Sequence, residues 1–75
     1  MAEPIGIVTA KDALLAAAGR LREADIPSER LDAEVLLAHV LGVRREYLYA
    51  HPERRLSFNE YERYQAVLEQ RLTRL

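Results

Sequence analysis

Cysteine is absent from this 75-residue sequence, which excludes disulfide bonds and any thiolate nucleophile or metal ligand. Neither sign of charge is in excess, because 11 lysines and arginines face 12 aspartates and glutamates, for a net charge of −1. This balance gives no general attraction toward nucleic acid or anionic membranes. The apolar runs are too short to span a bilayer, and the start, MAEPIGIVTAKD, does not resemble a secretory signal. We therefore expect a cytoplasmic protein.

Glycine and histidine are scarce, which leaves little material for a catalytic site. The three glycines, Gly6, Gly19 and Gly42, are scattered and form no phosphate-binding loop. No alternating run indicates a strand, so a nucleotide-binding crevice at the edge of a parallel sheet is not expected. His39 and His51 have no HExxH-type partner, and a metal site is therefore not expected. We expect His39 to be a packed or half-exposed helix residue and His51 a solvated loop residue.

Apolar residues at helical spacing are abundant, and they predict a first helix from Thr9 to about Ala24. Asp12 lies three residues after Thr9, which is close to a capping box. Pro27 disfavours a helical Ile26, so the helix should end before it. The apolar stripe of this helix consists of Ala10, Leu14, Ala17, Ala18 and Leu21.

The stretch SERLDAEVLLAHVLG, residues 28–42, predicts a second helix that other helices surround. Ser28 is the expected N-cap and Gly42 the expected left-handed residue at the C-terminal end. Apolar residues cover well over half of the circumference, so we expect this helix to form the centre of a bundle. The residues predicted to hold the bundle are Leu31, Val35, Leu36, Leu37, Val40 and Leu41.

The rest of the chain predicts a short helix within residues 44–50, ended by Pro52, and a last helix that begins after Ser57. Glu60 completes a capping box with Ser57. Arg71 and Arg74 suit the negative C-terminal end of that helix. The apolar stripe is Tyr61, Tyr64, Leu68, Leu72 and Leu75, and no glycine or proline terminates it. This pattern is compatible with a natural end at residue 75 and with a longer chain.

These elements predict an all-α fold: a small bundle of three long helices plus one short helix, with no strands. Residues 1–8 are expected to be an N-terminal arm and residues 9–75 a single helical domain. No catalytic, cofactor-binding or metal-binding residue is expected in it. The candidate partner contacts are four arginines near the short helix, as a docking patch for an acidic or mixed protein surface or simply as a solvated face: Arg44, Arg45, Arg54 and Arg55.

Two other functional classes have weaker support in the sequence. In AHVLGVRREYL, the spacing of Ala38, Gly42 and Leu48 is that of a DNA-binding helix-turn-helix unit. Pro52 leaves the second helix of that unit only about two turns, and the acidic net charge disfavours DNA binding. An acyl-carrier-like bundle would need a serine for its prosthetic arm, but Ser28, in PSERL, is better explained as a helix cap.

Three segments together resemble the amino-terminal helical domain of PrmC/HemK-type proteins, the release factor glutamine methyltransferases. They are RLDAEVLLAHVLG, a proline-containing loop, and a Leu-Ser-capped helix that ends in an arginine-rich turn. The similarity extends from about Thr9 to Leu75, and the order and spacing of the segments carry it.

The resemblance implies a function that the residues alone do not indicate. Proteins of this family methylate the glutamine side chain in the Gly-Gly-Gln motif of peptide chain release factors, with S-adenosylmethionine as the donor. The Asn-Pro-Pro-Tyr motif and the donor site belong to a separate C-terminal α/β domain, and neither occurs here. The resemblance therefore implies a non-catalytic N-terminal module that engages the release factor and the missing catalytic domain.

Overall fold

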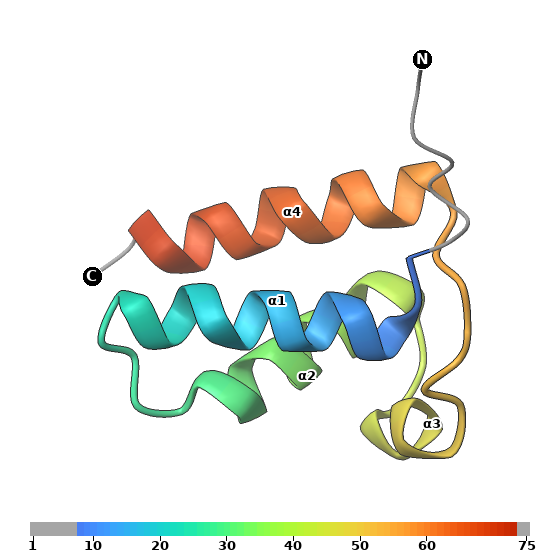
Figure 1. The fold of residues 1–75 in the computed structure, drawn as a ribbon. Coiled ribbons are helices and arrows are strands. Elements are labelled where there is room, and N and C mark those ends of the chain that lie inside the picture. The colour runs from blue at the N-terminus through green and yellow to red at the C-terminus, as the bar shows by residue number, and fades with distance from the viewer. Residues whose placement is uncertain (1–7, 74–75) are drawn as a thin grey trace.

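The computed structural model describes residues 8–73, which form four helices and, within that range, no strand (Figure 1). The helices are α1 (Ala10–Glu23), α2 (Glu29–Leu41), α3 (Arg45–Ala50) and α4 (Phe58–Thr73). The prediction of an all-α fold with three long helices and one short helix is confirmed. Only Val8 of the predicted arm is described, and the predictions for Arg74 and Leu75 fall outside the described residues.

The N-terminal end of α1 is held by both local and long-range hydrogen bonds. The Asp12 backbone N–H donates to Thr9 Oγ1 at 3.2 Å and the Thr9 backbone N–H to Asp12 Oδ2 at 3.4 Å, which completes the predicted capping box. The Ala10 N–H donates to the carbonyl oxygen of Arg54 at 2.7 Å. A helix leaves its first N–H groups without internal partners, so these bonds stabilise the helix start and attach it to the loop before α4.

The ends of α1 and α2 each place one residue in the left-handed conformation. The last residue of α1 is followed by Ala24, where the helix was predicted to end, and then by Asp25 at φ 62°. At the end of α2, Gly42 has φ 70°, as its position after the last apolar residue predicts. Glycine adopts this conformation without steric cost, and aspartate tolerates it better than most residues do.

Ser28 precedes α2 as predicted, but its side chain makes no capping hydrogen bond. Its backbone has ψ 40°, whereas the capping residue Thr9 is extended, with ψ 167°. An N-cap side chain reaches the second or third helical N–H from the extended conformation, so the Ser28 hydroxyl does not cap α2. Acidic residues in the first turn, Glu29 and Asp32, still complement the positive end of the helix.

α2 lies at the centre of the fold, as predicted, because it contacts each of the other three helices. It runs opposite to α1 and α4 in Figure 1. Leu37 is 0% exposed and Val40 is 5% exposed. Leu36 and Leu41 are partly buried against the core, so these four predicted core residues are confirmed.

The prediction is wrong for Leu31 and Val35, which are 47% and 46% exposed. They lie four residues apart, on the side of α2 that none of its neighbours covers. His39, predicted to be packed or half-exposed, lies four residues further along the same stripe and is exposed, so the packed alternative is wrong. Three neighbouring helices therefore cover α2 only in part, and its outer stripe remains in solvent.

The core combines mostly small side chains on α1 with large ones on α4. The four buried alanines of α1 let α2 approach closely: Ala10, Ala13, Ala17 and Ala18. From α4, Tyr64 and Leu68 are 0% and 1% exposed. The Tyr64 hydroxyl donates to the backbone carbonyl of Ala33 at 2.9 Å, and burial raises the pKa of this phenol. Tyr64 thus connects α4 to the middle helix by both packing and a hydrogen bond.

Candidate functional site

The four predicted contact arginines have two different environments in the structure. Arg45 Nη2 lies 3.2 Å from Glu34 Oε1, and the Tyr49 hydroxyl donates to the same oxygen at 2.7 Å. Hydrogen bonds with Tyr49 and Glu34 raise the pKa of the Arg45 guanidinium. Arg45 therefore holds α3 against α2, and its charge is already matched within the chain.

Arg54 is also engaged within the chain, by the helix cap of α4. Its Nη1 and Nη2 atoms lie 2.9 and 3.0 Å from the two carboxylate oxygens of Glu60. Glu60 in turn accepts the backbone N–H of Ser57 at 2.9 Å, while its own N–H donates to Ser57 Oγ at 3.2 Å, so the predicted capping box is confirmed. The Arg54 hydrogen bonds are the main cause that lowers the pKa of Glu60 to about 2.

The Glu60 pKa gives a pH-dependent prediction. A carboxyl whose pKa is lower in the folded state stabilises the fold above its unfolded pKa, here about 4.5, and this contribution is lost as the pH falls toward about 2. Glu60→Gln should lower the free energy of unfolding by about 1–2 kcal/mol at pH 7. Urea unfolding across pH 2–7 should show the difference from the parent chain shrinking below about pH 4.5.

Glu62→Gln is the matched control, because Glu62 is an exposed residue of the same helix with no ion pair to any of residues 8–73. It should change stability by less than about 0.5 kcal/mol at any pH. An equal loss in both variants would contradict the assigned role of the Arg54–Glu60 pair.

The other two arginines of the predicted patch point to solvent. Arg44 precedes α3 and is exposed, and Arg55 is exposed while its backbone forms an isolated bridge with Thr9. Neither forms an ion pair with any other residue in the range 8–73. The set proposed as a docking patch is thereby reduced to two unengaged charges, and its contact with a partner stays a prediction.

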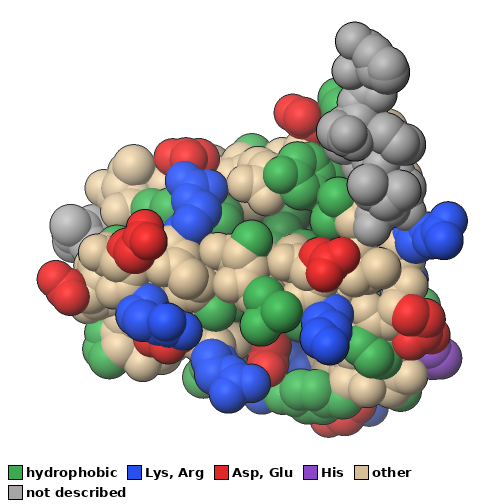
Figure 2. Space-filling view, viewed as in Figure 1, with side chains coloured by type: hydrophobic (Ala, Val, Ile, Leu, Met, Phe, Trp, Pro, Cys, Tyr) green, Lys and Arg blue, Asp and Glu red, His purple; other side chains and the backbone are tan. Residues whose placement is uncertain are grey.

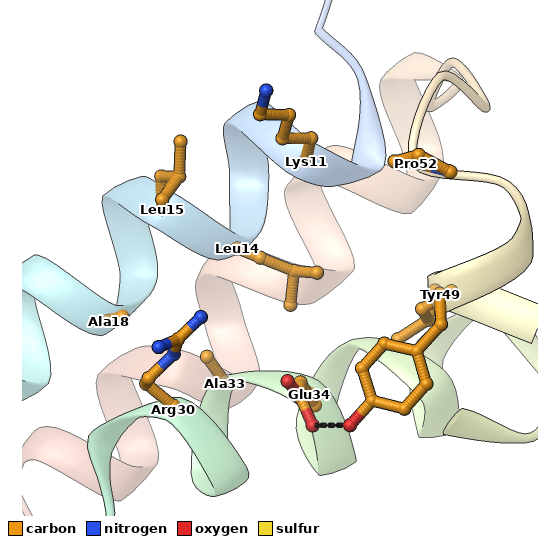
Figure 3. Close-up of a pocket in the computed structure, with 10 residues that line it drawn as sticks. Lys11, Leu14, Leu15, Ala18, Arg30, Ala33, Glu34, Tyr49 and Pro52 are labelled. Carbon is orange, nitrogen blue, oxygen red and sulfur yellow. Dashed lines mark hydrogen bonds between the residues drawn. The ribbon is translucent and has the colours of Figure 1, made fainter. Parts of the chain in front are cut away.

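A groove of about 310 Å³ lies between α1, α2 and α3 (Figure 3). Most of its lining is apolar, and Figure 2 shows hydrophobic side chains interleaved with charged ones on the face viewed there. Leu15 and Tyr49 on its edge are 62% and 59% exposed. The apolar lining consists of Leu14, Leu15, Ala18, Ala33, Leu48 and Tyr49, with Pro52 at one end.

The groove was not predicted from the sequence. The only sign of a groove in the sequence of α1 was Leu15, a leucine that lies beside the apolar stripe and not within it. Tyr49 becomes a wall of the groove because its hydroxyl is bound to Glu34, a contact across 15 residues of sequence. Local spacing carries no information about such a contact.

The described residues offer no group that would hold a metal ion, since no three histidine, aspartate or glutamate side chains of residues 8–73 gather at one place. Within the same range, no helix has the length and apolar character that crossing a bilayer requires. His51 lies against Tyr47 with ring centroids 4.5 Å apart, in the loop where it was predicted. The geometry is that of a small helical domain with an open apolar groove and a few charges around it.

The sequence over residues 12–75 matches the family model of the PrmC N-terminal domain. The chain therefore belongs to the PrmC N-terminal domain family, as the resemblance indicated. No solved structure gives a significant match.

Several curated relatives carry the name that the family implies. A release factor glutamine methyltransferase of Koribacter versatilis is 42% identical over 64 residues, which are 85% of this chain and 23% of that protein. One from Chlorobaculum tepidum is 46% identical over 50 residues, 67% of this chain and 17% of the relative. A bifunctional methyltransferase of Rickettsia bellii is 40% identical over 53 residues, 71% of this chain and 10% of the relative. The chain thus spans less than a quarter of each.

Proposed function

We propose that this chain is the N-terminal substrate-recognition and scaffold module of a longer release factor glutamine methyltransferase. The family match over residues 12–75 is the observation that carries the proposal. In this proposal the whole protein methylates the glutamine of the Gly-Gly-Gln motif in the cytoplasm, with S-adenosylmethionine as the donor. The donor site and the reacting groups lie in a catalytic domain outside this chain, and the helical module binds the release factor and supports that domain.

DNA binding, the alternative that the α2–turn–α3 spacing raised, has no further support. α3 has six residues, which is short for a helix that reads a DNA groove. Arg45 and Arg54 are already paired with carboxylates, and the net charge is −1. Acyl carriage has no support either, because the family relationship points elsewhere.

A salt-titrated binding assay separates the two functions. The full-length protein should bind the unmodified release factor of its own organism in a saturable way and should show no tight DNA binding at low salt. DNA binding that falls steeply with salt, through release of counterions from phosphates, would instead favour the helix-turn-helix alternative. The coding sequence that follows should encode an α/β domain with Asn-Pro-Pro-Tyr, and its absence would contradict the proposed methyltransferase.

A further inference from the structure

The groove between α1, α2 and α3 has a floor of buried or partly buried apolar side chains, namely Leu14, Ala18, Ala33 and Leu48. The exposed side chains of Leu15 and Tyr49 and two positive charges lie along its edge. In Figure 3, Leu14 points between α1 and α2, and Leu15 lies on the outer side of α1. An apolar surface of this kind is costly to leave in water and is typical of a site that a partner covers. The floor therefore fits an aliphatic side chain rather than a polar one.

The charges around this floor are unbalanced. Glu34 is the one acidic side chain in the lining, and Arg45 and Tyr49 already occupy its carboxylate, whose side chain is 16% exposed. Lys11 and Arg30 also line the groove, and neither forms an ion pair with any residue between 8 and 73. A ligand with carboxylates beside its apolar group would match both cations.

The position of the groove favours a second molecule over the remainder of the same protein. The last described turn of α4 lies at the end of the bundle opposite α3 (Figure 1). A domain joined after α4, as the proposed function requires, would begin at that far end. The segment that directly follows α4 therefore starts away from the groove beside α3.

We propose that this groove binds a surface segment of the release factor in which an aliphatic side chain is flanked by carboxylates. The aliphatic group enters between Leu14 and Tyr49 and contacts Leu15 at the edge, and the carboxylates pair with Lys11 and Arg30. This inference rests on the proposed function, since it names the surface through which the module engages its substrate.

Charge reversal tests the two cations. In the full-length protein, Lys11→Glu and Arg30→Glu should each raise the Kd for the unmodified release factor on the order of tenfold, because each places like charges together. The matched control is Arg63→Glu, which reverses an exposed arginine on α4, and its Kd should stay within about twofold of the parent value. If all three variants bind like the parent, the groove proposal is overturned while the proposed function stands.

A pair of leucine variants tests the apolar edge of the groove. Leu15→Asp should weaken binding on the order of tenfold or more. Leu31→Asp makes the same change at another exposed leucine, on the outer stripe of α2, and should leave binding unchanged. The circular dichroism spectra of both variants should match that of the parent protein, which checks that each is folded. Loss of binding in Leu31→Asp alone would place the contact on the outer stripe and overturn the proposal.

Zero-length cross-linking tests the chemistry of the occupant. Lys11 is the only lysine in these 75 residues, so a carbodiimide cross-link from a lysine of this module to an aspartate or glutamate of the release factor should start at its Nζ atom. Mass spectrometry should find that carboxylate beside an aliphatic residue. If the complex forms but Lys11 cross-links to no carboxylate of the release factor, the groove assignment is overturned. If the parent protein does not bind the release factor at all, the proposed function is wrong and the groove proposal with it.

Discussion

Leu37→Ala should lower the free energy of unfolding by about 2–5 kcal/mol, the cost of emptying a site in a packed core. Leu37 is 0% exposed and lies on the face of α2 that its neighbours bury. A domain of this size has about 5 kcal/mol or less in reserve, so the substitution could unfold much of the population. Urea unfolding of the 75-residue chain, followed by circular dichroism, measures the effect.

Leu31→Ala is the matched control, since it makes the same chemical change in the same helix. Leu31 is 47% exposed, so its truncation should lower the free energy of unfolding by less than about 0.5 kcal/mol. The slightly higher helix propensity of alanine offsets part of that loss. A loss below about 1 kcal/mol in Leu37→Ala would mean that Leu37 is not a core residue. Equal losses in the two variants would contradict the one-sided burial of α2.

Tyr64→Ala should have an effect of similar or greater size, about 3–5 kcal/mol, because it removes a large ring from the core. Tyr64 is among the largest side chains that are completely buried. It also donates a hydrogen bond to the Ala33 carbonyl, so the substitution removes both packing and a polar contact between α4 and α2. Thermal or urea unfolding of the purified variant gives the magnitude.

Tyr64→Phe separates the hydrogen bond from the packing. Keeping the ring and removing the hydroxyl should cost about 1 kcal/mol. Tyr61→Phe serves as the control, because Tyr61 is only partly buried on the same helix and its hydroxyl bonds to none of residues 8–73. If Tyr64→Phe is as damaging as Tyr64→Ala, the stability of the α2–α4 contact depends on the hydroxyl rather than on the ring.

The helix starts and ends were largely predictable because the groups involved lie within a few residues of one another. The capping boxes of α1 and α4 each join residues three apart, and Gly42 acts on the turn just before it. Ser28 is the exception, because its backbone has ψ 40° and not the extended conformation from which an N-cap side chain reaches the helix. Sequence indicated the right position for that cap but not its geometry.

The candidate site was much less predictable, because its charges are matched across turns and between helices and not at the three- or four-residue spacing within one helix. The sequence indicated four arginines as one basic set, yet in the structure Arg45 forms an ion pair with Glu34 and Arg54 forms one with Glu60. The carboxylate partner of Arg45 lies 11 residues away. Composition shows how many charges a chain carries, whereas only the folded chain shows which of them remain without a partner.

The sequence by itself determined the all-α class, the helix bounds, the absence of a thiol and the family relationship, since these depend on local spacing, composition and segment order. Only the tertiary structure decided which side of α2 faces solvent, as the exposure of Leu31 and Val35 shows. It also created the groove and joined Tyr64 to Ala33 across 31 residues. The physical reason is that burial and pairing depend on which surfaces meet, and helical periodicity does not specify the neighbours.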